Sequence, residues 1–192
     1  MFTQPFLRLI NQLDSCPWSG ATGRRIVPVP PVARPLYTPE ERRRRDASPW
    51  TTVQGVLAPV QFAVFLVSLG LVLRVLLTGE GEGAANASVV AKTLTLYAIM
   101  VTGAVWEHEV YGRYLFAPAF YWEDMVSMVV IALHTAYLAA LLSGAVDTHS
   151  LMLLALAAYA VYVVNAAQFI LKLRAARLQS DRSYPAAMGV SS

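Results

Sequence analysis

The stretch from Trp106 to Asp124 holds the side chains of this sequence that are best suited to proton transfer. It contains one imidazole, four carboxylates and many aromatic side chains. A carboxyl group that is kept from water holds its proton to a higher pH than usual, so it can act as an acid near neutral pH. The candidate catalytic residues are therefore Glu107, Glu109, Glu123 and Asp124.

Structural roles for the same carboxylates remain open. Acidic side chains such as Glu123 and Asp124 in the first turn of a helix complement the helix dipole, which contributes roughly 0.3–1 kcal/mol. Glu107 and Glu109 would then lie in a solvated loop and pair with Arg113.

Three polar side chains follow one helix face from this stretch onward. Glu123, Ser127 and His134 are separated by four and then seven residues, so an α-helix places them within about 40° of one another. His134 would lie about 16 Å along that helix from Glu123, near the middle of a membrane. An ionisable residue at such a depth indicates a functional site. A neutral histidine that bonds to a Tyr or Thr is the alternative.

Other segments also carry polar residues at helical spacing. Tyr162, Asn165 and Gln168 recur every three residues, and Gln54 and Gln61 lie two turns apart. Amides between membrane helices often only hold the helices together, at about 0.6 kcal/mol each. Taken together, however, these residues suggest a polar cavity that opens to one leaflet.

Four apolar segments must position these side chains. Residues 47–73, 125–146 and 148–171 contain no Asp, Glu, Lys or Arg, and 93–106 is a shorter charge-free segment. A helix needs about 20 mostly apolar residues to cross a bilayer. The sequence therefore predicts an all-α fold, an integral membrane four-helix bundle. The predicted spans are residues 53–77, 88–106, 122–142 and 151–173.

The flanks of this bundle are polar and basic. Of the 15 Lys and Arg residues, eight precede the first span and four lie at the end of the last span or beyond it. Such flanks attract anionic lipid headgroups and are typical of the cytoplasmic side. Both termini and the 107–124 connection are therefore predicted to be cytoplasmic, and no nucleic-acid partner is expected. Residues 1–35 are predicted to be a disordered cytoplasmic arm with a candidate surface helix at 5–13, residues 36–178 the membrane domain, and 179–192 a flexible tail.

Two cations and one proline lie in or near the predicted spans. Arg74 and Lys92 are expected to run along lipid and to reach the far interface with their charged ends. Contact with a substrate carboxylate is the alternative. Pro59 is expected to bend the first span or to mark its true beginning. The single cysteine, Cys16, excludes an intramolecular disulfide.

A metal centre bound by the protein itself is not expected. Di-iron sites in helical bundles favour Glu-x-x-His on two helices. Here Glu107 and His108 are adjacent, and Glu123 has no histidine three residues later. The sequence therefore predicts no protein-bound cofactor.

Five segments of the sequence carry a family resemblance. They are LYTPEE at 36–41, DASPW at 46–50, VQGVLAPVQF at 53–62, the stretch from 106 to 124, and ALHTAYL at 132–138. Together they resemble the 3-vinyl bacteriochlorophyllide hydratase family, also called chlorophyllide a hydratase, and the resemblance extends from about Leu36 to Arg177. It implies an integral membrane enzyme of bacteriochlorophyll biosynthesis. Such an enzyme adds water to the vinyl group of a magnesium chlorin to give a 1-hydroxyethyl group.

The implied reaction requires an acid and a base. Protonation of the terminal vinyl carbon leaves a cation that is delocalised into the ring, and water then attacks this cation. Paired carboxyl groups in different environments supply both roles in other enzymes. We predict Glu123 as the proton donor and Glu107 as the carboxylate that activates water. Asp124 or Glu109 would act as tuning charges.

The implied substrate carries its own magnesium, and a neutral imidazole is a common metal ligand. The candidate ligand is His134 or, because His134 lies far from Glu123, His108. The aromatic candidates would stack on the flat macrocycle. The predicted substrate-binding residues are His134, His108, Trp106, Tyr121, Trp122, Ser127, Asn165 and Gln168.

The resemblance also implies partners and a location. The expected partners are a chlorin pigment and membrane lipid, in a bacterial inner or intracytoplasmic membrane, and homo-oligomers or contacts with other pigment-synthesis enzymes remain open. A non-catalytic pigment-binding or photosystem assembly factor is the main alternative function, and it would need the same cavity without a proton donor. A small carrier would need a polar path across the whole membrane, for which the far-side loops offer few groups.

Overall fold

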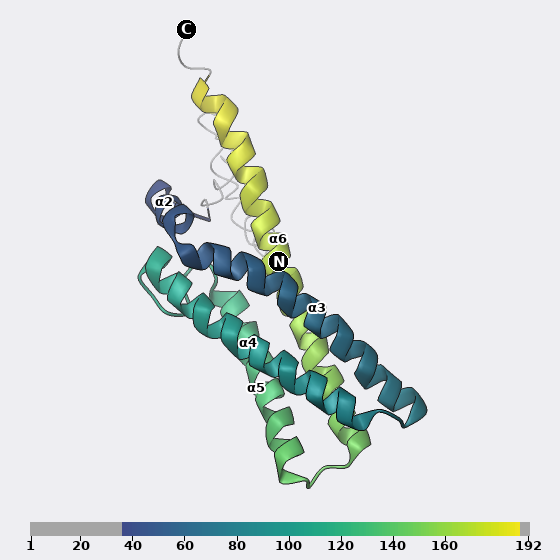
Figure 1. Ribbon diagram of the computed structural model, residues 1–192. Helices are drawn as coiled ribbons and strands as arrows, with labels where there is room; N and C mark the ends of the chain where they lie inside the picture. Colours follow the sequence, from purple (N-terminus) through teal and green to yellow (C-terminus); the bar gives the residue numbers. More distant parts are fainter. Residues whose placement is uncertain (1–35, 189–192) are drawn as a thin grey trace, which may run out of the picture. The chain divides into compact units, whose positions relative to one another are not determined.

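Helices make up most of the described part of the chain, which comprises residues 36–188; beyond Ala175 only the backbone is described. In this computed structural model the helices are α2 (Pro39–Ala47), α3 (Pro49–Thr78), α4 (Glu82–Tyr111), α5 (Tyr121–Ser143) and α6 (Thr148–Met188) (Figure 1). α3, α4, α5 and the part of α6 up to Ala175 are long and apolar enough to cross a membrane. The predicted all-α bundle with four spans is confirmed. The predicted arm at 1–35, with its candidate helix at 5–13, lies outside the described residues.

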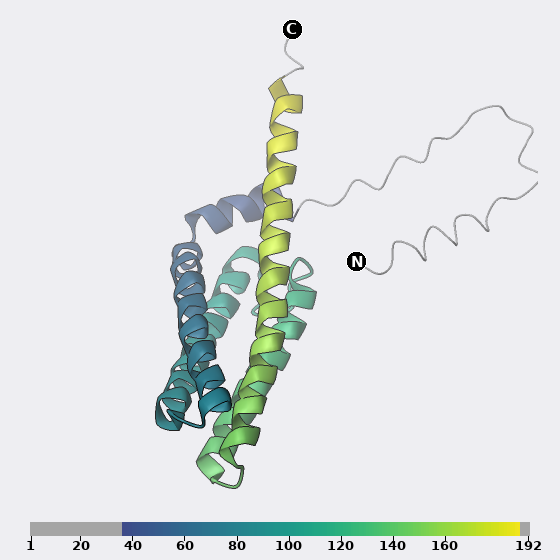
Figure 2. The same ribbon diagram turned by 90° about the vertical axis from the view of Figure 1, so that its right-hand side faces the viewer.

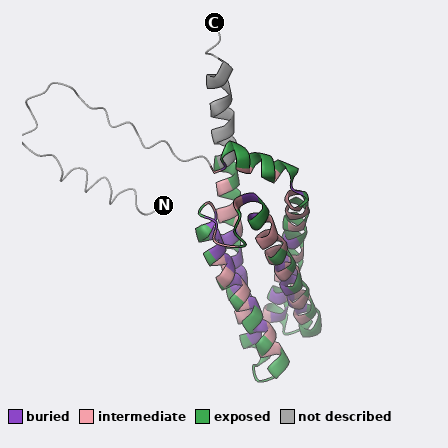
Figure 3. Cartoon of the chain, turned by 90° about the vertical axis from the view of Figure 1, so that its left-hand side faces the viewer, coloured by how far each residue is buried: buried purple, intermediate pink, exposed green. Residues whose placement is uncertain are grey.

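The four long helices form two pairs. α3 packs along α4 and α5 packs along α6, while the pairs meet through less extensive contacts of α3 with α6 and of α4 with α5 (Figures 1 and 2). Buried residues lie on the helix faces that meet other helices, and exposed residues cover the outer faces (Figure 3). Large apolar side chains such as Leu77 and Leu142 are among the exposed ones. Such apolar surface is expected of helices that face lipid.

The short helix α2 lies across the end of the bundle where α3 begins and α4 ends (Figure 2), and it packs against α4. Its start is fixed by a capping box. The Glu41 amide donates to the Thr38 hydroxyl at 3.2 Å, and the Thr38 amide donates to the Glu41 carboxylate at 2.7 Å. These bonds satisfy two backbone donors that a helix start otherwise leaves free. The capping box therefore stabilises the start of α2 at this end of the bundle.

The connection between α4 and α5 is shorter than predicted. α4 continues through Glu107 and Glu109 to Tyr111 and ends at Gly112, which has φ +76° and donates its amide to the His108 carbonyl at 2.9 Å. A left-handed residue of this kind ends helices commonly, and glycine adopts it at no steric cost. The alternative that places Glu107 and Glu109 in a loop is therefore wrong, although Glu109 is exposed. Apolar composition ends at Trp106, but the helical backbone ends only at the glycine.

Two further boundaries differ from the prediction. Pro59 lies well inside α3, which begins at Pro49, so Pro59 does not mark the start of the span. α6 runs on to Met188, so the predicted flexible tail at 179–192 begins within a helix. Only residues 189–192 of that tail lie outside the described residues.

Lys92 does not reach the membrane interface. Its side chain is fully buried, on the face of α4 that also buries Val89 and Leu96. It lies about 15 Å from the first residue of α4, which is too deep for its stem to carry the charge to the helix end. The expectation of an interfacial lysine is therefore wrong. Arg74, by contrast, is exposed near the end of α3, 3.7 Å from Glu80.

Candidate functional site

Three acidic side chains lie together at the end of the bundle that α2 covers. Glu107 on α4 and Glu123 and Asp124 on α5 are 5%, 8% and 4% exposed, and we call them the carboxyl cluster. Buried carboxylates are costly unless the protein provides hydrogen bonds or counter-charges. Each partner of the carboxyl cluster therefore bears on its chemistry.

The connection between α4 and α5 supplies backbone donors to the cluster. The Phe116 amide donates to Asp124 at 2.7 Å, and the Ala117 amide donates to Glu107 at 3.4 Å. Phe116 has φ +58° and is the only non-glycine residue in the described part with a positive φ. A bulky residue in this conformation is strained. The strain is consistent with a connection that is folded to aim its amides at the two carboxyl groups.

Glu107 and Asp124 also contact each other. Their carboxyl groups lie at hydrogen-bonding distance. Two ionised carboxylates at this distance repel each other, and a proton held between them removes the repulsion. The arrangement can therefore store one transferable proton.

Glu123 has a different partner. Its carboxylate accepts a hydrogen bond from the Lys172 ammonium at 2.6 Å, and this ammonium lies 4.9 Å from the ring centroid of Phe120. A protonated Glu123 would lose its ionic contact with Lys172. The geometry therefore favours a fixed ion pair beside the Glu107–Asp124 pair.

The remaining polar candidates of the 106–124 stretch lie outside the cluster. Glu109 is exposed and accepts a hydrogen bond from the Ser48 hydroxyl. His108 is exposed as well, and its ring stacks on Tyr114 at a centroid distance of 4.2 Å. Neither side chain faces the buried carboxyl groups.

The aromatic candidates divide in the same way. Trp106 packs edge-on against Phe120 at 5.7 Å and donates its indole N–H to the Thr51 hydroxyl at 2.9 Å. Tyr121 and Trp122 are 45% and 71% exposed and contact each other. Trp106 thus packs on the ring that lies beside the Lys172 ammonium, whereas the other two lie on the exposed surface of α5.

α2 closes the cluster from the end of the bundle. Tyr37, just before α2, is buried and stacks on Tyr111 at 6.0 Å, while the Arg45 guanidinium lies 4.7 Å from the Tyr37 ring centroid. Burial raises the pKa of the Tyr37 phenol, so the Tyr37 side chain stays uncharged where it packs on Tyr111.

The row of polar residues on α5 faces the interior, as predicted. Ser127 is buried and accepts a hydrogen bond from the Asn165 amide of α6 at 2.9 Å. The side-chain amide oxygens of Asn165 and Gln168 are buried without a hydrogen-bond partner among the described residues. The polar row thus leads from the carboxyl cluster toward the middle of the bundle.

His134 lies at the inner end of this row. It is fully buried, and its Nδ1 lies 2.8 Å from the Val130 carbonyl rather than near a Tyr or Thr hydroxyl. A carbonyl oxygen only accepts, so Nδ1 carries the proton, and in a neutral imidazole Nε2 keeps a free lone pair. Nε2 has no partner among the described residues.

Lys92 on α4 is close enough to His134 for their charges to interact, and we call the two the lysine–histidine centre. The Lys92 ammonium lies 3.4 Å from the ring centroid of Tyr162 but has no hydrogen-bond partner among the described residues. A cation–π contact contributes about 0.5–2 kcal/mol, whereas a lysine at the bilayer centre costs at least about 2.5–3.5 kcal/mol. The contact with Tyr162 alone does not offset the burial of this charge.

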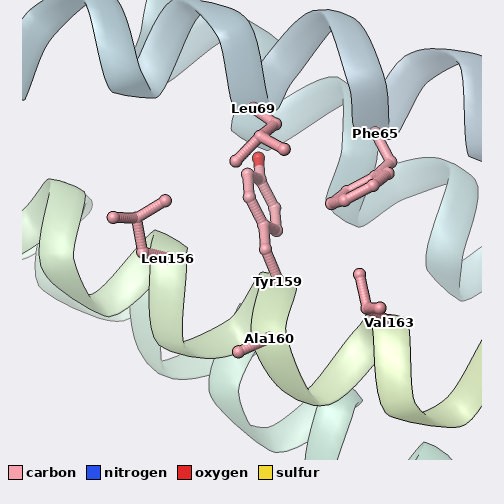
Figure 4. Close-up of a pocket in the computed structure, with 6 residues that line it drawn as sticks. All are labelled: Phe65, Leu69, Leu156, Tyr159, Ala160 and Val163. Carbon is pink, nitrogen blue, oxygen red and sulfur yellow. The ribbon is translucent and has the colours of Figure 1, made fainter.

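A small groove lies beside this centre. It has a volume of about 240 Å³ and is lined by Phe65 and Leu69 of α3 and by Leu156, Tyr159, Ala160 and Val163 of α6 (Figure 4). Phe65 and Tyr159 also contact the centre, because Phe65 lies 5.9 Å from the Lys92 ammonium and Tyr159 lies 5.8 Å from the His134 ring. The groove is apolar and smaller than the roughly 300–1,000 Å³ of typical ligand pockets.

Known proteins give this geometry a context. The sequence model of the 2-vinyl bacteriochlorophyllide hydratase family matches residues 37–175 of this chain. The chain belongs to this family. It is 63% identical over 153 residues to the 2-vinyl bacteriochlorophyllide hydratase of Rhodobacter capsulatus, covering 80% of this chain and 89% of that protein. It is 62% identical over 157 residues to the Cereibacter sphaeroides protein of the same name, covering 80% and 97%. No solved structure matches the chain.

The predicted membership of the hydratase family is thus confirmed, although the family name assigns the vinyl group to position 2 rather than 3. The region that matches 2-vinyl bacteriochlorophyllide hydratase contains both the carboxyl cluster and the lysine–histidine centre. The sequence singled out the three clustered carboxylates and His134. It missed Lys172 as a partner of Glu123, and it missed the burial of Lys92. The position of Lys92, four residues before Leu96 on a buried face, was the available signal.

Proposed function

We propose that this protein is a membrane hydratase that adds water to the vinyl group of a bacteriochlorophyllide. Membership of the family and the names of the two relatives support this reaction. The observation that carries the mechanism is the contact between two buried carboxyl groups, Glu107 and Asp124. Such a pair offers an acid and a base at one place, as hydration of an alkene requires.

We assign the proton donor to Glu107 and the base to Asp124. Asp124 accepts the shorter backbone bond, at 2.7 Å, and charge-assisted bonds of this length stabilise an ionised carboxylate. The hydrogen bond from the Ala117 amide to the Glu107 carboxyl group is longer, at 3.4 Å. Glu107 is therefore the better place for the shared proton. The prediction of Glu123 as donor stays the competing assignment.

Glu107 and Asp124 together supply and recover the proton that the reaction uses. Glu107 gives its proton to the terminal vinyl carbon, and the cation that forms on the adjacent carbon is delocalised into the macrocycle. Asp124 accepts a proton from the water molecule whose oxygen bonds to that carbon. The proton then passes from Asp124 to Glu107, and the pair is ready for the next substrate.

The neighbours of the pair support this chemistry. The fixed charges of Glu123 and Lys172 set the electrostatic field beside the developing cation, and a preorganised field of this kind is a large contributor to catalysis. Trp106 and Phe120 shield the pair from bulk water and offer apolar surface to a flat ring. Glu109 lies outside this arrangement and acts at most through its bond to Ser48.

The magnesium belongs to the substrate, and no cofactor held by the protein is part of the proposal. His134 has the free Nε2 and the backbone-bonded Nδ1 that are typical of metal-binding histidines. It lies about 15 Å along α5 from Asp124, however, which is longer than the distance from the magnesium to the vinyl group of a chlorin. A His134–magnesium bond and hydration at the carboxyl cluster therefore do not fit one pigment position.

The four apolar helices indicate a multi-pass membrane protein. We propose a bacterial inner or intracytoplasmic membrane, with both termini and the carboxyl cluster at the cytoplasmic side, because the basic flanks favour that side. Surrounding lipid and the chlorin are the proposed partners. We also propose association with further copies of this chain or with other pigment-synthesis enzymes.

The decisive experiment uses the purified full chain in detergent with chlorophyllide a in isotopically labelled water. Labelled oxygen should enter on the carbon next to the ring, and one deuterium from heavy water should enter the terminal methyl group. Pigment that binds tightly and is recovered unchanged under all conditions would instead support the pigment-binding factor. A boiled sample is the control for uncatalysed hydration.

A further inference from the structure

The lysine–histidine centre has a charge that the protein does not balance. In the part of the chain that the structure describes, the ion pairs join other residues and none includes Lys92. The side chain is nevertheless fully buried and its ammonium has no hydrogen-bond partner there. A buried cation in a membrane protein is costly and usually pairs with an anion or faces a functional cavity. The missing partner is therefore expected to come from a ligand.

We infer that Lys92, with His134 beside it, binds the carboxylate of the pigment's propionate side arm. The inference rests on the proposed function, because it takes the substrate to be a chlorophyllide. A chlorophyllide is the free-acid form of its pigment and carries a propionate where the mature pigment carries a long-chain ester. This carboxylate is the one anionic group that such a substrate brings into the bundle.

The donors and acceptors at the centre suit this ligand. An ammonium has three N–H donors and no acceptor. In the pigment complex one donor bonds to the ligand carboxylate. A second is then free to turn toward His134 Nε2, whose lone pair the bond from Nδ1 to Val130 leaves available. The ligand carboxylate therefore satisfies the Lys92 ammonium, whereas His134 Nε2 takes its hydrogen bond from the ammonium and not from the ligand.

The distance between the two buried sites suits the pigment as well. His134 and Asp124 are separated by about 15 Å along α5, and the vinyl group and the propionate arm project from opposite edges of the macrocycle. A pigment with its acid arm at Lys92 thus places its vinyl group at the carboxyl cluster. The polar row with Ser127 and Asn165 lies between the two ends.

The groove between α3 and α6 gives the pigment a route from lipid. Phe65 and Tyr159 line this groove (Figure 4), and both also contact the lysine–histidine centre. α3 and α6 pack less extensively than the pairs α3 with α4 and α5 with α6. Separation of α3 from α6 therefore opens the groove at a smaller cost in helix contacts than separation within either pair.

The test compares a free acid with its ester. Equilibrium binding of chlorophyllide a and of its methyl ester to the full chain in detergent is measured by quenching of pigment fluorescence. The wild-type protein should prefer the free acid by roughly thirtyfold or more, because loss of one partner from a buried charge pair has an effect of this size. Equal affinities for acid and ester in the wild-type protein overturn the inference, and this arm needs no variant.

Single-residue variants test which side chain causes the preference for the free acid. Lys92→Met keeps the length and volume of the side chain without its charge, and it should bind the ester like the wild type and lose the preference for the acid. Arg74→Met removes the exposed arginine that lies 3.7 Å from Glu80 and should keep the full preference. A preference that persists in Lys92→Met, or disappears in Arg74→Met, contradicts the assignment to Lys92.

A competition with lipid carboxylates and a parallel assay of hydration complete the test. A long-chain fatty acid offers the same carboxylate without a macrocycle, and it should not displace chlorophyllide. Displacement at concentrations similar to that of the pigment would assign the centre to lipid carboxylates instead. The hydration product is measured in the same samples: acid preference without product rejects only the proposed function, and product without acid preference rejects only this inference.

Discussion

The carboxyl cluster and the lysine–histidine centre are both buried between the same helices, but the protein treats their charges differently. The acidic groups have protein partners: backbone amides for Asp124 and Glu107, and an ammonium for Glu123. The Lys92 ammonium and His134 Nε2 have none among the described residues. Both regions lie on α4 and α5, about 15 Å apart along α5.

The difference separates two uses of a buried charge. Where the protein supplies the partners, the groups are held in one geometry and can pass a proton without rearrangement. Where the protein leaves a charge without a partner, the burial is costly until a ligand arrives. The free energy that the ligand recovers there favours one orientation of a flat and otherwise apolar pigment. The carboxyl cluster thus carries the chemistry at one end of the polar row, and the lysine–histidine centre fixes the orientation of the pigment at the other end.

The largest expected effect is the loss of either member of the proton-sharing pair. Glu107→Gln and Asp124→Asn keep the size of each side chain and remove its acid–base function. Each should lower kcat by about 100-fold to 10,000-fold, measured as formation of the 1-hydroxyethyl product.

Glu80→Gln, in an exposed loop between α3 and α4, is the matched control and should keep full activity. Pigment binding by the two pair variants should remain measurable, which separates lost catalysis from lost folding. Activity near the wild-type level in either pair variant would reject the pair as the catalytic centre.

A smaller effect is expected from the ion pair beside it. Glu123→Gln leaves Lys172 without its anion, which should cost about 1.5–3 kcal/mol of stability and reduce activity moderately. The double variant Glu123→Gln with Lys172→Met should recover part of the stability, because no unpaired charge is left. Thermal unfolding in detergent and product formation are the measurements. If Glu123 is instead the proton donor, its single variant will be as inactive as Glu107→Gln and the double variant will not recover activity.

A change at the glycine that ends α4 should have the next largest effect. Gly112→Ala places a Cβ at φ +76°, and a left-handed conformation costs a non-glycine residue about 1–2 kcal/mol. The thermal midpoint should fall, and activity should fall with it because the Phe116 amide follows Gly112 in the connection. Gly83→Ala is the control: this glycine has an ordinary helical φ and open space around its Cβ position, so no loss of stability is expected. Equal effects of the two changes would show that the turn at Gly112 does not hold the site.

The sequence predicted the spans and much of the carboxyl cluster because both depend on local patterns. Apolar run length fixes the number of spanning helices, and the spacing of Glu123, Ser127 and His134 fixes their common face. The partners of these groups depend on how distant helices meet. Lys172 lies 49 residues after Glu123, and no spacing rule links the two. Lys92 was misplaced because snorkelling is the usual behaviour of a lysine near a span end, and only tertiary packing shows that this one points inward.

The smallest predicted effects compare one buried serine from each region. Ser68, near the lysine–histidine centre, lies 2.5 Å from the Tyr159 hydroxyl, whereas Ser127, near the carboxyl cluster, bonds to Asn165. Hydrogen bonds between membrane helices are worth about 0.6 kcal/mol on average and at most about 1.7 kcal/mol. Ser68→Ala should have the larger effect on the thermal midpoint, because Ser68 is fully buried and its loss leaves an enclosed tyrosine hydroxyl unpaired. Adding Tyr159→Phe to Ser68→Ala should then cost little more, since both partners are gone. Additive losses in this double-mutant cycle would mean that the Ser68–Tyr159 bond does not join α3 to α6, and that the route proposed between these helices lacks this closing contact.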